Sequence, residues 1–352
     1  MQEGNNRIYL RLDRALSTND WISYFSGTRV LHLVDSTSDH CALLIVDSIA
    51  MQPSRKRMFH FEDMWTKKEE CEDIIKNAWE GCLHRGIPDS ISSSLQSCAA
   101  ELEKWNKTVF GYVPKQIQSK RKALNELTLQ DRDGVMGKEI NSLRKEINDL
   151  LDCEETLWHQ RSRVFWYGQG DRNTKFFHSK VSQRRKKNTI SGIWDENGNW
   201  CDTNESIAAT AIAYFKALFT TSNPCRIMEF TNTIPTKVTD EMNQGLIAAF
   251  TREEVVTALK QMHPTKAPGP DGMSAIFFQK YWDVVGNDIT CMVLNVLNSD
   301  ISIADINRTN ITLIPKINCP LKMSDFRPIS LCNVVYKLVS KVMANHLKNI
   351  LP

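Results

Sequence analysis

Three side chains near the N-terminus have the chemistry of a phosphate-cleaving or metal-binding site. Asp39 and His40 are adjacent in the stretch SDHC, and Asp13 precedes His40 by 27 residues. A carboxylate can bind a divalent metal or help to polarise water, and an imidazole oriented by a second carboxylate can contact a scissile phosphate. The same Asp-His pair before an apolar run is also typical of an ordinary polar turn, so both interpretations stay open.

A second candidate is the stretch KAPGPDG, residues 266–272. Pro fixes φ and Gly permits positive φ, so we expect this loop to hold one preset shape. Lys266 and the backbone N–H groups of the loop can then contact an anion. A rigid connector between two helices is the alternative that the same residues allow.

Cations cluster in two blocks of a chain whose net charge is only +3. Residues 161–187 hold nine Lys and Arg against one acidic residue, and residues 316–348 hold six against one. The rest of the chain therefore carries −10. Two basic blocks on an acidic background indicate a polyanionic partner such as a nucleic acid. The alternative is that both blocks are ordinary solvated surfaces.

The first block interleaves aromatic residues with cations and includes the run Arg184, Arg185, Lys186 and Lys187. Cations can neutralise phosphates, and aromatic faces can stack on bases. The alternative is that Trp166, Phe176 and Phe177 belong to a core while the cations are a solvated face.

Hydrophobic patterns place these motifs in an α+β fold that is predominantly helical. An apolar stripe at helical spacing predicts a helix in a helical hairpin, and its members are Ile140, Leu143, Ile147, Leu150 and Leu157. The run CALLIV (41–46) and residues 311–314 are expected strands. The pair Asn197-Gly198 predicts a hairpin with a type I′ turn.

Helix signals are clear in the C-terminal third. Thr251 and Glu254 have the spacing of a capping box, and a final helix is expected from about 331 to 350. The expected divisions are a β-rich segment at 1–50, a helical linker at 51–160, a basic and aromatic segment with a β-hairpin and a helix at 161–220, a linker at 221–250, and a last segment at 251–352.

Other features narrow the class of protein. No apolar run approaches the roughly 20 residues of a membrane-spanning helix, and the N-terminus lacks the apolar core of a signal peptide. We therefore expect no membrane partner. The ten cysteines include no CxxC pair, which favours reduced thiols over a disulfide framework or a zinc site.

The order of the motifs resembles polyproteins of plant LINE-type non-LTR retrotransposons. LDR (12–14) with SDHC (38–41) is similar to the C-terminal end of endonuclease/exonuclease/phosphatase domains. Three further stretches resemble the linker of these polyproteins. They are QRSR (160–163), GDRNTKFFH (170–178) and DENGNW (195–200). The C-terminal part of the chain resembles the N-terminal, fingers part of the reverse transcriptase. The motifs that carry this resemblance are, in order, KAPGPDG, LIPK (313–316), FRPISL (326–331) and the helix after it.

The resemblance implies roles for these residues. Asp13 would orient His40, His40 would contact the phosphate, and Asp39 would serve a metal or proton transfer. In the reverse transcriptase part, Lys316 and Arg327 match positions expected to hold the triphosphate of the incoming nucleotide. Lys266 lies in a segment expected to close over the template strand.

The resemblance also implies an RNA-directed DNA polymerase with a linked endonuclease, with RNA and DNA as partners, Mg²⁺ as cofactor, and a nuclear or cytoplasmic location. This chain has no Tyr-x-Asp-Asp motif and no counterpart of the upstream nuclease ligands. We therefore expect it to be catalytically incomplete and not to hold Mg²⁺ stably. The alternatives are a non-catalytic nucleic-acid-binding protein derived from a retroelement and a decayed reading frame without a stable fold.

Overall fold

The computed structural model describes residues 14–18, 21, 25, 28–33, 42–46, 58–83, 91–131, 135–164, 174–225, 227–233, 235, 237–299 and 301–351. The fold is α+β and predominantly helical, as predicted. Its described strands form three separate two-stranded antiparallel sheets. None of the helices in the described part of the chain is long and apolar enough to cross a membrane.

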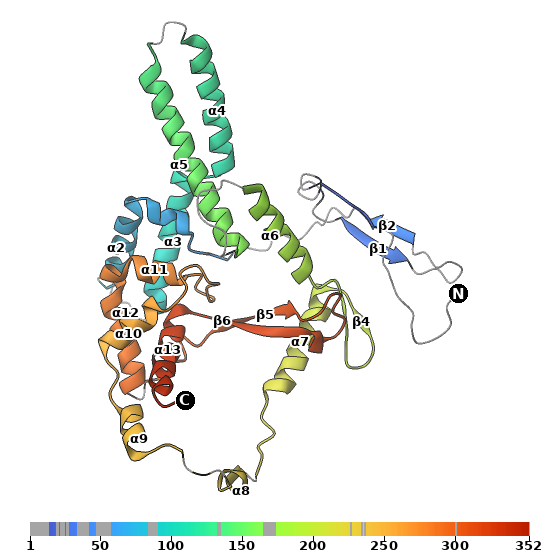
Figure 1. The fold of residues 1–352 in the computed structure, drawn as a ribbon, viewed down its shortest axis with the longest axis vertical. Coiled ribbons are helices and arrows are strands. Elements are labelled where there is room, and N and C mark those ends of the chain that lie inside the picture. Colours follow the sequence, from blue (N-terminus) through green and yellow to red (C-terminus); the bar gives the residue numbers. More distant parts are fainter. Residues whose placement is uncertain are drawn as a thin grey trace.

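The main hydrophobic core joins two distant parts of the chain (Figure 1). The helices around it are α2 (Glu70–Leu83), α3 (Ile91–Val109), α10 (Arg252–Lys260), α11 (Ala275–Lys280), α12 (Trp282–Asn298) and α13 (Val334–Lys348). The ring of Phe61, just before the 3-10 helix η1 (Asp63–Lys67), lies edge-on to Phe277 with centroids 5.4 Å apart. Full burial of such a side chain stabilises the fold by roughly 1.5–3 kcal/mol. Residues of the expected linker and of the last segment are therefore held in one core.

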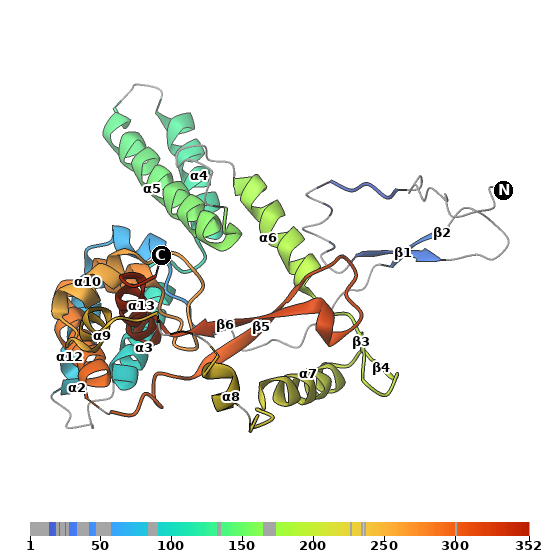
Figure 2. The same ribbon diagram turned by 60° about the horizontal axis from the view of Figure 1, so that its bottom comes forward.

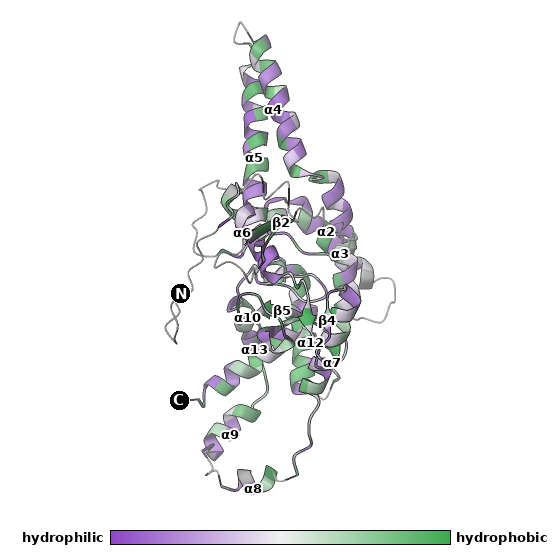
Figure 3. Cartoon of the chain, turned by 90° about the vertical axis from the view of Figure 1, so that its right-hand side faces the viewer, coloured by the Kyte–Doolittle hydropathy of each residue, from purple (hydrophilic) through white to green (hydrophobic). Residues whose placement is uncertain are grey.

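A helical hairpin stands out from this body, as the apolar stripe predicts (Figure 1). It consists of α4 (Val113–Gln130) and α5 (Gly137–Ser162). Ile140 and Ile147 are buried, and hydrophilic and hydrophobic residues alternate along both helices (Figure 3). Lys120 of α4 pairs with Glu146 of α5 across the hairpin. An exposed pair of this kind adds only about 0–1 kcal/mol, so the apolar stripe is the main stabilising contact of the hairpin.

A basic helix and a small mixed unit follow the hairpin. They comprise α6 (Thr174–Asn188), β3 (Ile193–Trp194), β4 (Trp200–Cys201), α7 (Asn204–Phe219), α8 (Ile227–Thr231) and α9 (Asp240–Ile247). The hairpin at β3 and β4 is confirmed, with Trp194 opposite Trp200. Its type I′ turn is wrong, because among the described residues near the turn only Gly198 has positive φ, at 81°. The Asp195 carboxylate accepts the N–H groups of Asn197 and Asn199, which favours a turn closed by Asp195.

The remaining described strands are β1 (Arg29–Leu33) paired with β2 (Ala42–Val46), and β5 (Thr309–Pro315) paired with β6 (Phe326–Cys332). The strands expected at 41–46 and 311–314 are confirmed. The final helix begins later than expected, at Val334, because residues 326–332 pair with β5 instead of coiling. The long β5–β6 ribbon leaves the helical body and ends beside α7 (Figures 1 and 2).

Candidate nucleic-acid interface

The residues proposed for nuclease chemistry, Asp13, Asp39 and His40, lie outside the described residues. Their roles stay predictions. Within the described part of the chain, no group of three or more His, Cys, Asp or Glu side chains could hold a metal ion.

Helix α6 presents the run of four cations at its C-terminal end. Arg184, Arg185, Lys186 and Lys187 are all exposed. This end of a helix carries a partial negative charge, which favours cations there by typically 0.3–1 kcal/mol. Four adjacent cations on the last turns therefore form a solvent-facing positive surface.

The aromatic residues of α6 divide between core and surface. Phe177 is 1% exposed, and its ring lies edge-on to His159 of α5 at 5.5 Å. Phe176 is half-buried, with the Lys180 ammonium 5.4 Å from its ring centre. Phe177 is thus a core residue, while Trp166 lies outside the described residues.

A second aromatic contact joins α5 and α6 beside a cation. The rings of Trp158 and His178 are in contact, with centroids 3.5 Å apart and planes tilted by 36°, and the Arg161 guanidinium lies 5.7 Å from the Trp158 ring. Burial lowers the pKa of His178, and the charge of Arg161 lowers it further. His178 is therefore neutral near pH 7 and does not add to the positive surface.

The β5–β6 ribbon brings Lys316 and Arg327 together. Arg327 pairs with Ile314, and Lys316 follows Ile314 by two residues. The backbone N–H of Lys316 donates to the carbonyl of Asp325 at 2.7 Å, which continues the ladder past the end of β5. Because side chains alternate along a strand, Lys316 and Arg327 point to the same face at diagonal positions.

Both cations on the ribbon are exposed. The Lys316 ammonium donates to the carbonyl of Ser324 at 2.7 Å, which holds it at the base of the ribbon's turn. Hydrogen bonds from the backbone N–H groups of Leu321 and Lys322 lower the pKa of Asp325 and keep it ionised. Lys322 is a further exposed cation of the turn, which only the net charge of its block indicated.

The two basic blocks meet at this end of the ribbon. Helix α6 contacts β5 and lies beside the ribbon in both ribbon views (Figures 1 and 2). Just beyond α6, Ile190 packs against a small core that contains Ile193, Phe215, Met323 and Phe326. The C-terminal end of α6 is therefore held next to the ribbon that carries Lys316 and Arg327. The fold thus joins cations that lie more than a hundred residues apart in sequence.

The KAPGPDG loop lies elsewhere, against the start of α13. Lys266 is exposed, whereas Gly269 and Gly272 are buried. The loop borders a cavity of about 400 Å³ whose cationic lining residues are Lys266, Lys337 and Lys341. The Lys337 ammonium donates to the carbonyl of Ala267 at 3.2 Å, and burial lowers its pKa. Lys337 and Lys341 are one turn apart on α13 and line the same cavity as Lys266. The spacing of these residues in the sequence did not predict this placement.

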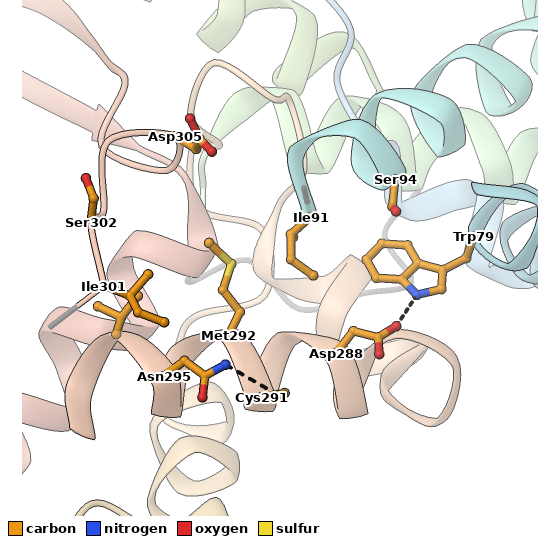
Figure 4. Close-up of a pocket in the computed structure, with 11 residues that line it drawn as sticks. Trp79, Ile91, Ser94, Asp288, Cys291, Met292, Asn295, Ile301, Ser302 and Asp305 are labelled. Atoms are coloured by element: carbon orange, nitrogen blue, oxygen red, sulfur yellow. Dashed lines mark hydrogen bonds between the residues drawn. The ribbon is translucent and has the colours of Figure 1, made fainter. Parts of the chain in front are cut away.

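A second cavity, of about 440 Å³, has the opposite character (Figure 4). It lies between α2, α3 and α12, and its described lining includes the acidic residues Asp288 and Asp305 but neither Lys nor Arg. The Trp79 indole at its wall donates to the Asp288 carboxylate at 2.8 Å. A cavity with this charge does not suit a phosphate backbone.

Comparison with known proteins finds similarity to a transposon protein. Over 330 aligned residues the chain is 24% identical to the Transposon TX1 uncharacterized 149 kDa protein of Xenopus laevis. The alignment covers 89% of this chain and 25% of that protein, so the chain spans about a quarter of its relative's length. No protein-family model matches the chain.

Proposed function

We propose that this chain is part of a LINE-type retrotransposon polyprotein and that it binds RNA and DNA in an RNA-directed DNA polymerase with a linked endonuclease. The similarity to a transposon protein along most of the chain supports a retroelement origin. The order of the nuclease-like, linker-like and fingers-like motifs supports the finer assignment. Polymerase and endonuclease activities are proposed for the longer protein.

The single observation that carries nucleic-acid binding is the convergence of α6 with the β5–β6 ribbon. Their exposed cations form the composite basic surface, which we define as Arg184, Arg185, Lys186, Lys187, Lys316, Lys322 and Arg327. A surface of this kind binds phosphates and releases counterions, so affinity falls with salt. If about six cations of the surface meet phosphates of a single strand, the log–log salt slope is about −4.

On this surface we propose that Lys316 and Arg327 contact the triphosphate of an incoming nucleotide. Their shared face suits one anionic ligand. The planar guanidinium of Arg327 can make two parallel hydrogen bonds to phosphate, and Lys316 supplies a point charge. Lys266 is proposed to contact the template backbone from the KAPGPDG loop.

Binding of fluorescent single-stranded RNA and DNA, measured by anisotropy between 50 and 200 mM salt, tests the proposal. Replacing Arg184, Arg185, Lys186 and Lys187 together with Ala should weaken binding at least tenfold and flatten the salt slope. The matched control replaces four exposed lysines away from the surface, Lys104, Lys107, Lys122 and Lys145. Equal losses in both variants would show that only net charge matters and would count against the composite surface.

The second candidate function is a nucleic-acid-binding protein of retroelement origin that does not polymerise. The exposed cationic end of α6 favours it, because strand binding there needs no nucleotide site. Nucleoside triphosphate binding separates the two functions. If RNA and DNA bind through α6 while triphosphate binding is unaffected by changes at Lys316 and Arg327, the second function is the correct one.

A further inference from the structure

Three arginines, Arg161, Arg163 and Arg184, lie near one another where α5 meets α6, and they share one nearby carboxylate, that of Glu62. Helix α5 ends at Ser162, and Arg163 follows it in a left-handed conformation with φ 58°. The Arg184 guanidinium of α6 reaches back and donates to the Ser162 carbonyl at 3.1 Å. Ser162 is 1% exposed, so this hydrogen bond fixes Arg184 directly beside the backbone of Arg163.

The neighbouring carboxylate is already engaged. Arg161 donates to the Glu62 carboxylate at 2.8 Å. Glu62 therefore neutralises one guanidinium of the three, and Arg163 and Arg184 retain a surplus of positive charge. The NH1 atom of Arg163 is buried and has no hydrogen-bond partner among the described residues. A buried donor without a partner destabilises the fold, because it has lost its hydrogen bonds to water.

The electrostatics of Arg163 agree with this geometry. Burial lowers the pKa of its guanidinium, the nearby charge of Arg184 lowers it further, and Glu62 only partly opposes these effects. The left-handed backbone of this non-glycine residue adds conformational strain. Strained, desolvated and like-charged groups are typical of functional sites, because a ligand can repay their cost.

We infer that Arg163 and Arg184 form a binding site for one phosphate group, and that a phosphodiester of the bound nucleic acid occupies it. The inference rests on the proposed function for the identity of the ligand, but the anion site itself does not. Arg184 is exposed and Arg163 is half-buried, so the anion meets Arg184 first and Arg163 turns its NH1 toward it. The unpaired donor then gains a charge-assisted hydrogen bond, which is roughly twice as strong as a neutral one.

The site differs from the other exposed cations at the end of α6, which are Arg185, Lys186 and Lys187. Those residues offer sequence-independent charge to any strand. The Arg163–Arg184 pair instead holds one phosphate at a defined place beside the ring contact of Trp158 and His178. A strand held there has its backbone fixed at the base of the α4–α5 hairpin.

The test uses the full chain and inorganic phosphate as the first probe. Phosphate should raise the thermal unfolding midpoint by about 2 °C or more relative to chloride at equal ionic strength, since it binds the folded state. Arg163→Gly should abolish this shift while raising the midpoint measured in chloride, because glycine adopts positive φ without strain. Arg144→Gln, an exposed change on the hairpin, should leave the phosphate shift intact. A phosphate shift that persists in Arg163→Gly would overturn the site.

A second measurement identifies the source of the phosphate. With a single-stranded oligonucleotide, Arg163→Gly should reduce the magnitude of the log–log salt slope by about 1, the change expected for one lost phosphate contact. If the oligonucleotide binds with an unchanged slope, the site does not hold a phosphodiester and the inference fails while the proposed function stands. If the natural chain does not bind the oligonucleotide at all, the proposed function fails. A phosphate shift lost in Arg163→Gly then still supports the anion site, with a free phosphate as its ligand.

Discussion

Gly269 of the KAPGPDG loop lies directly against Asn333, the residue before α13. A Cβ at position 269 would stand 2.2 Å from the Asn333 side-chain oxygen and 2.4 Å from its backbone nitrogen. The Asn333 oxygen also accepts the backbone N–H of Asp271 at 3.3 Å. The loop is therefore shaped by its contact with the start of α13.

Gly272 holds the other side of the same loop. Its φ is 73°, and a Cβ there would stand 2.1 Å from the carbonyl oxygen of Phe59. Its own carbonyl accepts the N–H of Phe61 at 3.0 Å. The stiff composition of the loop thus has a structural cause, which is close backbone packing on two sides.

Replacing Gly269 with Ala should lower the free energy of unfolding by about 1–3 kcal/mol or more, because the contact is with backbone that cannot move aside. Gly272→Ala should cost at least as much, since it adds positive-φ strain. Urea unfolding followed by circular dichroism measures both. Gly245→Ala is the control: a Cβ there meets nothing within 4 Å, and alanine within α9 should stabilise by about 0.5–1 kcal/mol. Equal stability of Gly269→Ala and the natural chain would contradict this packing.

Local signals in the sequence were enough to predict several elements. The Thr251–Glu254 capping box forms with both hydrogen bonds, and the apolar stripe lies on α5 of the helical hairpin. These features depend on residues three or four apart, which are neighbours within one helix, so they form without contacts from the rest of the fold. The strand β5 was predictable from another local signal, a short apolar run with β-branched residues.

Features set by distant residues were not predictable in this way. No strand was predicted at residues 326–332, yet they pair with β5, and the ribbon tolerates Pro328 because both of its strands are edges. The shared core of Phe61 and Phe277 and the meeting of α6 with β5 depend on tertiary packing. The unpaired donor of Arg163 depends on a backbone conformation that no spacing rule indicates.

The buried carboxyl group of Asp271 should make stability depend on pH. Burial raises its pKa to about 6, against an opposing contribution from Lys337. One oxygen accepts the N–H of Met273 at 3.0 Å, and the other is buried with no partner among the described residues. The folded chain therefore binds the proton more tightly than the unfolded chain, whose group has its ordinary pKa of 3.8.

The stabilising effect of this protonation is fully present below about pH 4 and is lost as the pH rises through about 6. A shift of about two units corresponds to roughly 2–3 kcal/mol. Asp271→Asn keeps an acceptor for Met273 and cannot ionise, so it should be more stable than the natural chain at pH 8. Urea unfolding between pH 4 and 8 measures the difference between the two proteins. A difference that stays constant with pH would show that Asp271 does not titrate in this window.

The hydrogen bond from Trp79 to Asp288 links α2 to α12 at the wall of the acidic cavity (Figure 4). Trp79 is 2% exposed, so its N–H has no easy access to water. Asp288→Ala should lower the free energy of unfolding by about 1–3 kcal/mol, because it leaves that donor unpaired. Asp288→Asn keeps an acceptor oxygen and should cost less than half as much. Thermal unfolding of the two variants side by side tests the link, and equal losses would mean that the charge of Asp288, and not its acceptor, is what matters.

The diagonal placement of Lys316 and Arg327 makes the proposed triphosphate contact testable. Arg327→Lys keeps the charge but removes the planar fork, so the dissociation constant for a nucleoside triphosphate should rise about tenfold, the equivalent of ~1.4 kcal/mol. Arg308→Lys makes the same chemical change at an exposed position just before β5 and should alter the constant less than twofold. Calorimetric titration measures both constants. The pairing of residue 327 with Ile314 is made by the backbone, so Arg327→Lys should keep the register, and a tenfold change confined to this variant would report lost phosphate contacts. Matching changes in both variants would remove Arg327 from the proposed site and leave the ribbon as a part of the general basic surface.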